Sequence, residues 1–283
     1  MYNVTLRQAQ GDAEQSRSIK FQIIKYARVW WKLTTLTFSA DLANRFAAGI
    51  YIVGKLIRFL FFLLLLILLV DKTKTLVGYD LNQVIFFFLT FNLIDILIQL
   101  LLRGVYHFRP LIVSGDFDLI LTKPIHPLFR SLASHADIMD LITLVPLLGY
   151  MVYFLISGQI QFTFLGLILY LLLIACSFII GMALHIMILA IGVLTTEVDH
   201  LIWIYRDMTG MGRFPIDIYR EWLRNFLIFV VPVGVIMTFP AKALMGLLSV
   251  PMILFSIFLA FILLFLSFGL WNFALKKYTS ASS

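Results

Sequence analysis

The chain has few charged residues and almost no cysteine. Only 13% of its 283 residues are charged and 61% are hydrophobic, whereas a soluble domain has about 25% charged and roughly 45–50% apolar residues. Runs such as 56–70 and 250–275 are too long and too apolar to be hidden together in one soluble core. These runs are rich in Leu, Ile and Phe throughout rather than alternating, so the sequence predicts an all-α polytopic membrane protein.

Several classes of site are missing from the sequence. Cys176 is the single cysteine, which excludes a disulfide framework within the chain. The five histidines show no metal-ligand spacing, and no calcium-loop ligand series follows the acids of segment 115–118. We therefore predict no metal site. His135 and Asp140 have a spacing found in some glycerolipid acyltransferases, but two polar residues at the start of a span explain it more simply, and we predict no catalytic residues.

The sequence also contains no phosphate-binding loop. The pattern Gly-x-x-x-x-Gly-Lys-Ser/Thr does not occur, and no soluble segment is large enough to hold a nucleotide. We therefore predict no cofactor in this chain, and any pumping must use a partner or an ion gradient. The net charge of +7 is spread over the membrane-flanking segments rather than one soluble module, which does not favour a nucleic-acid partner.

Six segments are long and apolar enough to cross a membrane. A helical span needs about 20 apolar residues, and the candidates are 51–70, 81–102, 138–157, 162–182, 184–205 and 250–273. The fourth and fifth come from one apolar stretch that is too long for a single span, and we expect a tight turn near Gly181–His185. These spans form a predicted transmembrane domain over residues 46–283.

The basic residues predict the orientation of the spans. Residues 1–48, the loop 103–137 and the C-terminus carry thirteen of the 22 Lys and Arg side chains. Since cytoplasmic segments are enriched in Lys and Arg, we predict that both termini and the loop 107–137 are cytoplasmic, and that 206–248 lies outside. The polar tail 1–19 has no apolar core typical of a signal peptide, so the first span is expected to insert the protein.

Two segments beside the spans have unusual composition. Residues 20–45 mix basic residues with Trp30 and Trp31, which favours a helix lying in the cytoplasmic interface, with a continuation of the first span as the alternative. Residues 226–248 are apolar but contain Pro232 and Pro240. Because proline breaks helices, we expect a re-entrant pair of short helices here rather than a seventh span.

Polar side chains inside the spans are candidates for function. One face of the second span carries four of them at helical spacing: Asn92, Asp95, Gln99 and Arg103. The first span carries Lys55 and Arg58 near its cytoplasmic end, and counting about 1.5 Å per residue puts Arg58 and Asp95 at matching depth. We predict an Arg58–Asp95 ion pair that locks the two helices, with a substrate or proton site at Asp95 as the alternative.

Two acidic residues are expected near the outer end of the fifth span. Glu197 and Asp199 lie close together there, followed by His200. They are interpreted either as the lining of an exit path or as markers of the membrane interface.

The loop 107–137 is predicted to contain short helices with defined ends. Gly115 and Asp116 form a break and a helix N-cap, Asp118 adds an acid to the first turn, and Pro124 ends the helix. Pro127 begins another short segment. The apolar residues expected to be available for contact are Phe117, Leu119, Ile120 and Leu121. Such a segment suits docking onto another protein, with a helix lying at the membrane surface as the alternative.

Two separated motifs resemble a known family. "SGDFDLILTKPIHPLF" and "GRFPIDIYREWLRNFLIFVVPVGVIMTFPAKALMG" are similar to segments of bacterial ABC transporter permeases of the type-2 class, in its six-span daunorubicin- or viologen-exporter-like branch. The ending "FALKKYTSASS" is similar too. Phe214 stands where Tyr is usual and Thr122 precedes Lys123 where an aliphatic residue or Arg is common, and the resemblance runs from about residue 20 to the end.

The resemblance implies a subunit of an ATP-driven exporter in the bacterial cytoplasmic membrane. Its substrate would be amphipathic or hydrophobic, and access would alternate between the two sides. The partners would be two copies of an ABC ATPase, which hold ATP and Mg, and a second permease chain, identical or related. Residues 20–45 would form the connecting helix. The coupling residues implied are Gly115, Asp116, Phe117, Asp118, Lys123 and Pro124, and the outer re-entrant region would include Arg213, Pro215, Pro232 and Pro240. A gradient-driven carrier or channel is the alternative function.

Overall fold

The computed structural model describes residues 22, 24–40, 43, 45–135 and 138–279, with the side chains of 45, 138 and 139 excepted. The predicted polar tail 1–19 lies outside these residues. Helices make up most of the described chain, and the only β-pairing within it is an isolated bridge between Leu76 and Tyr79. The prediction of an all-α fold is confirmed.

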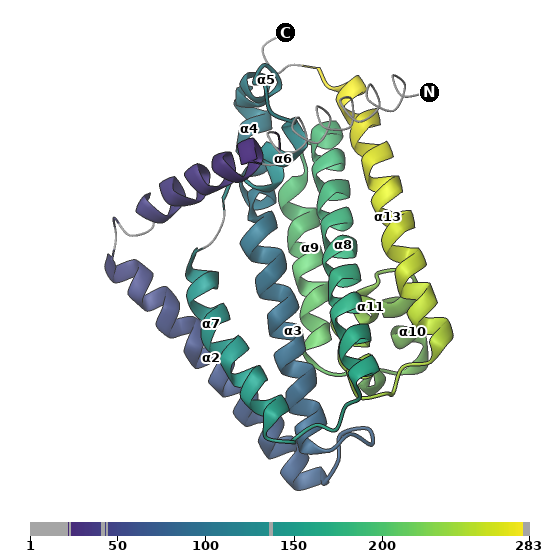
Figure 1. Ribbon diagram of the computed structural model, residues 1–283. Helices are drawn as coiled ribbons and strands as arrows, with labels where there is room; N and C mark the ends of the chain where they lie inside the picture. Colours follow the sequence, from purple (N-terminus) through teal and green to yellow (C-terminus); the bar gives the residue numbers. More distant parts are fainter. Residues whose placement is uncertain (1–21, 23, 41–42, 44, 136–137, 280–283) are drawn as a thin grey trace, which may run out of the picture.

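Long helices form a bundle with two distinct ends (Figure 1). The bundle contains α2 (Arg45–Thr73), α3 (Leu81–Leu102), α7 (Ile138–Ile156), α8 (Phe164–Thr195) and α13 (Val250–Lys277). One end, which we call the α5 end, carries α4 (Phe108–Val113), α5 (Asp116–Leu121) and α6 (Pro127–Leu132). The opposite end, called the α10 end, carries the loops 74–80 and 157–163 and the helix α10 (Glu221–Phe229).

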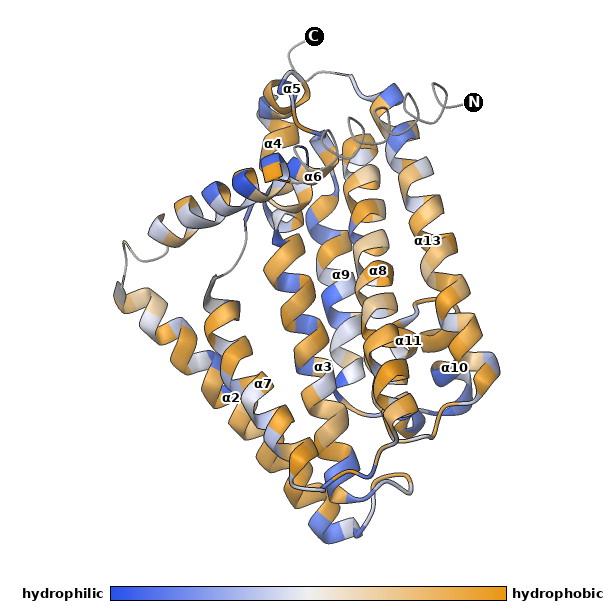
Figure 2. Ribbon diagram, viewed as in Figure 1, coloured by the Kyte–Doolittle hydropathy of each residue, from blue (hydrophilic) through white to orange (hydrophobic). Residues whose placement is uncertain are grey.

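The long helices have the length and composition of membrane spans. Four helical stretches qualify among the described residues, namely Phe46–Thr73, Leu81–Val113, Phe164–Thr195 and Val250–Lys277, and Asp140–Ile156 is a shorter apolar helix. Figure 2 shows these helices apolar along most of their length, with hydrophilic residues at the two ends of the bundle and at a few positions within it, on α3 and the neighbouring α9. Phe46–Thr73 and Val250–Lys277 bury little of their surface within the chain, whereas Leu81–Val113 is mostly buried. Because several helices have the length and apolar composition of membrane spans, this is a polytopic membrane protein.

The region predicted as the fourth and fifth spans folds differently from the expectation. Residues 164–195 form one continuous helix, α8, and there is no turn at Gly181–His185. His185 is fully buried and its Nδ1 lies 2.8 Å from the Gly181 carbonyl oxygen, so this polar residue is accommodated inside the helix. A Cβ on Gly181 would lie 2.6 Å from Ile98, so the glycine allows close helix packing and does not mark a turn.

The turn between these two segments lies instead at Thr196, which ends α8 with a left-handed backbone (φ 63°). The next helix is α9 (Val198–Gly210), which has only 13 residues. At about 1.5 Å per residue, α9 is too short to cross a bilayer core of about 30 Å. The chain therefore stops part of the way along the bundle before it continues into short helices.

Residues 211–248 are broken into short helices between α9 and α13. They form η2 (Met211–Arg213), η3 (Ile216–Ile218), α10, α11 (Val233–Met237) and α12 (Phe239–Leu244). All five residues of α11 are buried. The prediction that 226–248 does not form a seventh long helix agrees with this arrangement, but there are three short helices where two were expected.

A helix over residues 24–40 precedes α2 and contacts the α5 end. The Lys25 ammonium donates a hydrogen bond of 2.7 Å to the carbonyl oxygen of Pro124. The Tyr26 hydroxyl accepts one of 3.2 Å from the His126 backbone N–H, and the Tyr26 ring packs edge-on against Phe129 at 4.8 Å. The helix therefore holds the turn between α5 and α6.

Candidate functional site

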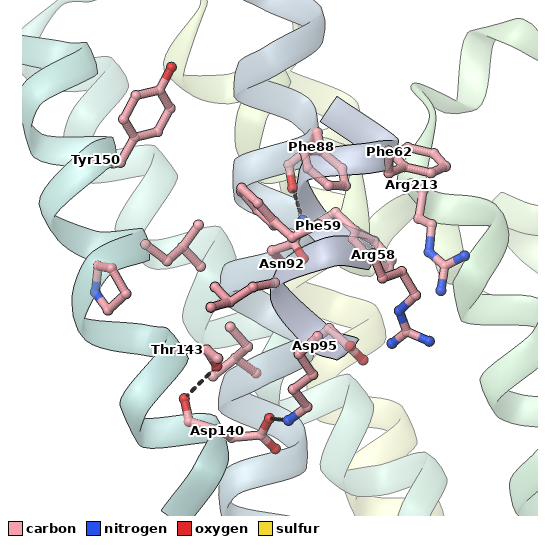
Figure 3. A pocket seen from close by; sticks show the side chains of 16 residues that line it. Arg58, Phe59, Phe62, Phe88, Asn92, Asp95, Asp140, Thr143, Tyr150 and Arg213 are labelled. Carbon is pink, nitrogen blue, oxygen red and sulfur yellow. Dashed lines mark hydrogen bonds and ion pairs between the residues drawn. The ribbon is translucent and has the colours of Figure 1, made fainter. Parts of the chain in front are cut away.

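A cavity of about 210 Å³ lies between α2, α3 and α7, with η2 at its border. Figure 3 shows its side chains pointing into one space from these elements. Its wall combines phenyl rings with charged groups. The lining residues are Lys55, Leu56, Arg58, Phe59, Phe62, Phe88, Phe91, Asn92, Asp95, Ile96, Asp140, Thr143, Pro146, Leu147, Tyr150 and Arg213.

Asp95 forms an ion pair with Arg206 of α9 and not with Arg58. The Arg206 Nη1 donates to the Asp95 Oδ1 over 2.6 Å, and each side chain is about a quarter exposed. The predicted Arg58–Asp95 pair is therefore wrong. Counting residues along the two helices put Arg58 and Asp95 at matching depth, and both line the same cavity. The count did not reveal that α9 places Arg206 beside Asp95. Arg206 had been assigned to the outer segment.

Asp140, at the start of α7, is the second carboxylate of the cavity. The Lys55 ammonium donates a hydrogen bond to its Oδ1, and Arg103 lies 3.8 Å from its Oδ2. Asp140 is only 4% exposed. Both carboxylates that line the cavity are thus neutralised by cations, and α2, α3 and α7 are tied together at this level.

Two arginines of the cavity have no such carboxylate. Arg58 and Arg213 extend toward the same part of the cavity (Figure 3), and among the described residues neither forms an ion pair. The Arg213 guanidinium lies 5.8 Å from the ring centroids of both Phe62 and Phe91. Such cation–π contacts orient the group but leave its hydrogen-bond donors available.

The other predicted polar residues of the second span separate in the structure. The Asn92 side chain lines the cavity and donates to the Phe88 carbonyl oxygen over 2.7 Å. Gln99 does not line the cavity and donates to the Tyr106 hydroxyl over 3.2 Å. Of the predicted intramembrane set, Lys55, Arg58, Asn92 and Asp95 come together around one cavity.

From the sequence alone, neither the place of Asp140 and Tyr150 in the cavity lining nor the pairing of Arg206 with Asp95 was predicted. Asp140 had been interpreted as a polar residue at the start of a span. In the structure it is buried and forms an ion pair with Lys55. The assignment of Arg206 to the outer segment could have been questioned from the sequence, since this residue directly follows the apolar segment 201–205. Arg213, expected at the outer face, lies at the cavity border instead.

The α5 end contains the predicted docking segment. Gly115 has a left-handed backbone (φ 79°) at the N-cap of α5, and Asp116 and Asp118 lie in its first turn. Pro127 begins α6, as expected. Lys123 and Pro124 are exposed in the turn that follows α5.

Phe117 was expected to be available for contact, but it is fully buried. Its ring packs edge-on against Phe108 at 5.2 Å, Trp271 at 6.4 Å and Tyr278 at 5.3 Å. Ile120 is buried with it, whereas Leu119 is 61% and Leu121 38% exposed. The buried face fixes α5 to the end of α13, and the opposite face is the surface available to a partner.

The packing around α5 also shifts the pKa of Tyr278, the residue that directly follows α13. Its hydroxyl is buried, and burial together with the nearby Asp118 carboxylate raises the pKa of Tyr278 to about 12. The phenol therefore stays neutral at physiological pH.

Glu197 and Asp199 do not lie where an outer exit path was expected. Asp199 lies 3.6 Å from Arg109 of α4, and Glu197 lies 3.3 Å from His200. They are therefore at the α5 end, because the long helix α8 carries the chain back to that end before α9 begins. The expectation of an outer position rested on the misplaced turn and is wrong.

An all-α bundle whose long apolar helices are able to span a membrane, with a cavity between three of them, defines a polytopic membrane protein. Residues 56–282 match the family model described as "ABC-2 family transporter protein". This match covers more than half of the chain, so the chain belongs to that family, whose members are the membrane permease components of ABC transporters and work with an ABC ATPase. No curated protein and no solved structure matches the chain.

Proposed function

We propose that the chain is the permease subunit of an ATP-driven exporter in the bacterial cytoplasmic membrane, with both termini in the cytoplasm. Membership in the ABC-2 family supports the transport role. The basic segments at the α5 end support the orientation, since cytoplasmic segments are enriched in Lys and Arg. The exported molecule would be amphipathic or hydrophobic.

The observation that carries this proposal is the construction of α5. Its buried face is anchored through Phe117 to Trp271 and Tyr278, while Leu119 is exposed on its opposite face. A short helix whose buried face packs against the end of α13 would pass a movement of α5 on to the bundle. It is therefore suited to couple a separate ATPase to the bundle.

The same arrangement supports a mechanism of alternating access. ATP and Mg would bind to two ATPase subunits, one for each of two permease chains, identical or related. Movement of α5 would reach the cavity through α3, because α3 runs from the cavity residue Asp95 to the helices of the α5 end. The short helices α10–α12 would form the re-entrant outer part.

The test is reconstitution with and without the ATPase. The chain is co-expressed with a candidate ABC ATPase, purified and placed in vesicles with a fluorescent amphiphile. We expect the two proteins to co-purify and to accumulate or release the dye only with ATP and Mg. Flux that needs an ion gradient and no ATPase would instead support a gradient-driven carrier.

A further inference from the structure

We propose that the cavity between α2, α3 and α7 binds the anionic head group of an amphiphile through Arg58 and Arg213. This inference deepens the proposed function, because it names the chemistry of the molecule that enters the transport protein. The assignment rests on the charge, depth and lining of the cavity.

The charges around the cavity are unbalanced. Lys55, Arg58 and Arg213 line it together with two carboxylates. Those carboxylates already have partners. Asp140 pairs with Lys55, and Asp95 pairs with Arg206, which does not itself line the cavity. The cavity therefore presents two guanidinium groups to a ligand and is electropositive.

The depth of Arg58 makes this imbalance costly. Arg58 lies next to the midpoint of α2, which runs from Arg45 to Thr73. A charge near the middle of a span is unfavourable unless it faces a polar partner, and the nearby positive charge of Arg213 repels it. An anion placed between the two guanidinium groups would remove both problems, because guanidinium pairs well with phosphate and carboxylate.

The rest of the lining suits an apolar tail. Phe59, Phe62 and Phe88 form one continuous aromatic wall, with ring centroids of the two phenyl pairs 5.1 and 5.0 Å apart. Leu56 borders the cavity and is 45% exposed on the outer surface of α2. An acyl chain could pass from the charged centre along this apolar surface into the membrane, whereas a small hydrophilic anion would gain nothing from these rings.

Binding is measured on the full-length chain in a neutral detergent, without the ATPase, so the result does not depend on transport. The probes are dioctanoyl phosphatidic acid, dioctanoylglycerol with the same tails and no phosphate, and inorganic phosphate with no tails. The variants are Arg58→Gln, Arg213→Gln and their double variant. Arg220→Gln, at the start of α10 and outside the cavity, is the matched control for loss of one positive charge.

We expect the phosphatidic acid to bind more tightly than either other probe. Each arginine substitution should weaken its affinity by about tenfold, and Arg220→Gln should leave it unchanged. Arg58→Lys, which keeps the charge, should retain part of the affinity and verifies that loss of binding is not loss of folding. The melting temperature of each variant without ligand provides the same check.

Three results would overturn the inference. Equal affinity of the double variant and the wild type would exclude the arginines, equal binding of dioctanoylglycerol would exclude recognition of the anion, and equal binding of inorganic phosphate would exclude an amphiphile. A double variant that binds lipid normally but changes its oligomeric state would place the arginines at an interface between chains. ATP-driven transport of another molecule would still support the proposed function in each case.

Discussion

Arg206 donates a 2.6 Å hydrogen bond to Asp95, so α9 is tied to α3 by an ion pair in the middle of the bundle. The pair forms part of the cavity wall, because Asp95 lines the cavity. It also explains why a helix of 13 residues with polar side chains is stable at this depth. The charged group of Arg206 is compensated there by the carboxylate.

Removing one member of this pair is predicted to destabilise the protein more than removing both. Loss of one partner of a fully buried pair costs about 3–5 kcal/mol because a charge stays uncompensated. Since both side chains are about a quarter exposed, we expect a smaller loss for Asp95→Asn or Arg206→Gln, with partial recovery in the double variant. Thermal unfolding of the detergent-solubilised chain measures all three.

The exposed pair Asp199–Arg109 provides a control for this cycle. Asp199 is 43% and Arg109 47% exposed over a 3.6 Å contact, and such pairs contribute about 0–1 kcal/mol. Asp199→Asn should change the melting temperature little. Additive effects in the Asp95–Arg206 cycle would contradict the structural role of that pair. A fully stable Asp95→Asn variant without transport would assign Asp95 to the substrate or proton path instead.

The two faces of α5 are predicted to respond differently to the same substitution. Phe117→Arg would bury a charge among Phe108, Trp271 and Tyr278, and loss of a buried Phe side chain alone costs about 3–5 kcal/mol. We expect little folded protein. Leu119→Arg, at a position that is 61% exposed, should fold normally but lose association with the ATPase. Size-exclusion yield and co-purification distinguish the two outcomes.

Leu247→Arg is the matched control, because Leu247 is 48% exposed in the connection between α12 and α13, away from α5. It should retain the ATPase. Normal association and normal ATP hydrolysis in Leu119→Arg would show that the exposed face of α5 is not the docking surface.

Much of the fold could be predicted from the sequence because membrane spans are set by length and apolarity. The predicted span 81–102 coincides with α3, and the span 138–157 differs from α7 by one residue. The failure over 162–205 has a physical cause. Composition alone cannot distinguish one long helix from two short spans when a polar residue such as His185 is buried and its Nδ1 contacts a carbonyl oxygen of its own helix.

The candidate site was predicted only in part, because ion pairing depends on which helices are neighbours. Four members of the predicted intramembrane polar set, Lys55, Arg58, Asn92 and Asp95, line one cavity, whereas Gln99 of the same set does not. The prediction could not identify Arg206 and Asp140 as the partners, because both come from elements whose position follows from tertiary packing. Phe117 shows the same limit, since a short amphipathic helix does not reveal by itself which face is covered.

The contact between the N-terminal helix and the α5–α6 turn gives a third prediction. The His126 N–H donates to the Tyr26 hydroxyl over 3.2 Å, and the Tyr26 ring packs on Phe129. Tyr26→Phe removes only the hydrogen bond and should speed hydrogen exchange at the His126 amide. Tyr26→Ala removes the ring contact too and should speed exchange over the whole turn. Unchanged exchange in Tyr26→Ala would mean that the helix does not hold this turn.

The stacked pair His107–His135 at the α5 end predicts a pH dependence of stability. The rings are 3.9 Å apart, and burial, followed by the positive charge of His107, lowers the pKa of His135 from 6.5 to about 4. Between these values the unfolded chain binds a proton that the folded chain does not. Stability must therefore fall as the pH decreases from 6.5 toward 4, and this group contributes no slope above that window.

His135→Phe keeps an aromatic ring next to His107 but cannot be protonated. The melting temperature of this variant should decrease less steeply than that of the wild type between pH 6.5 and 4, and the two curves should run parallel above pH 7. His135 is partly exposed, so solvent screening makes the difference smaller than the full pKa shift would give. Parallel curves across the whole range would mean that His135 accepts its proton equally well in the folded and unfolded chain, and that its stacking on His107 carries no electrostatic cost.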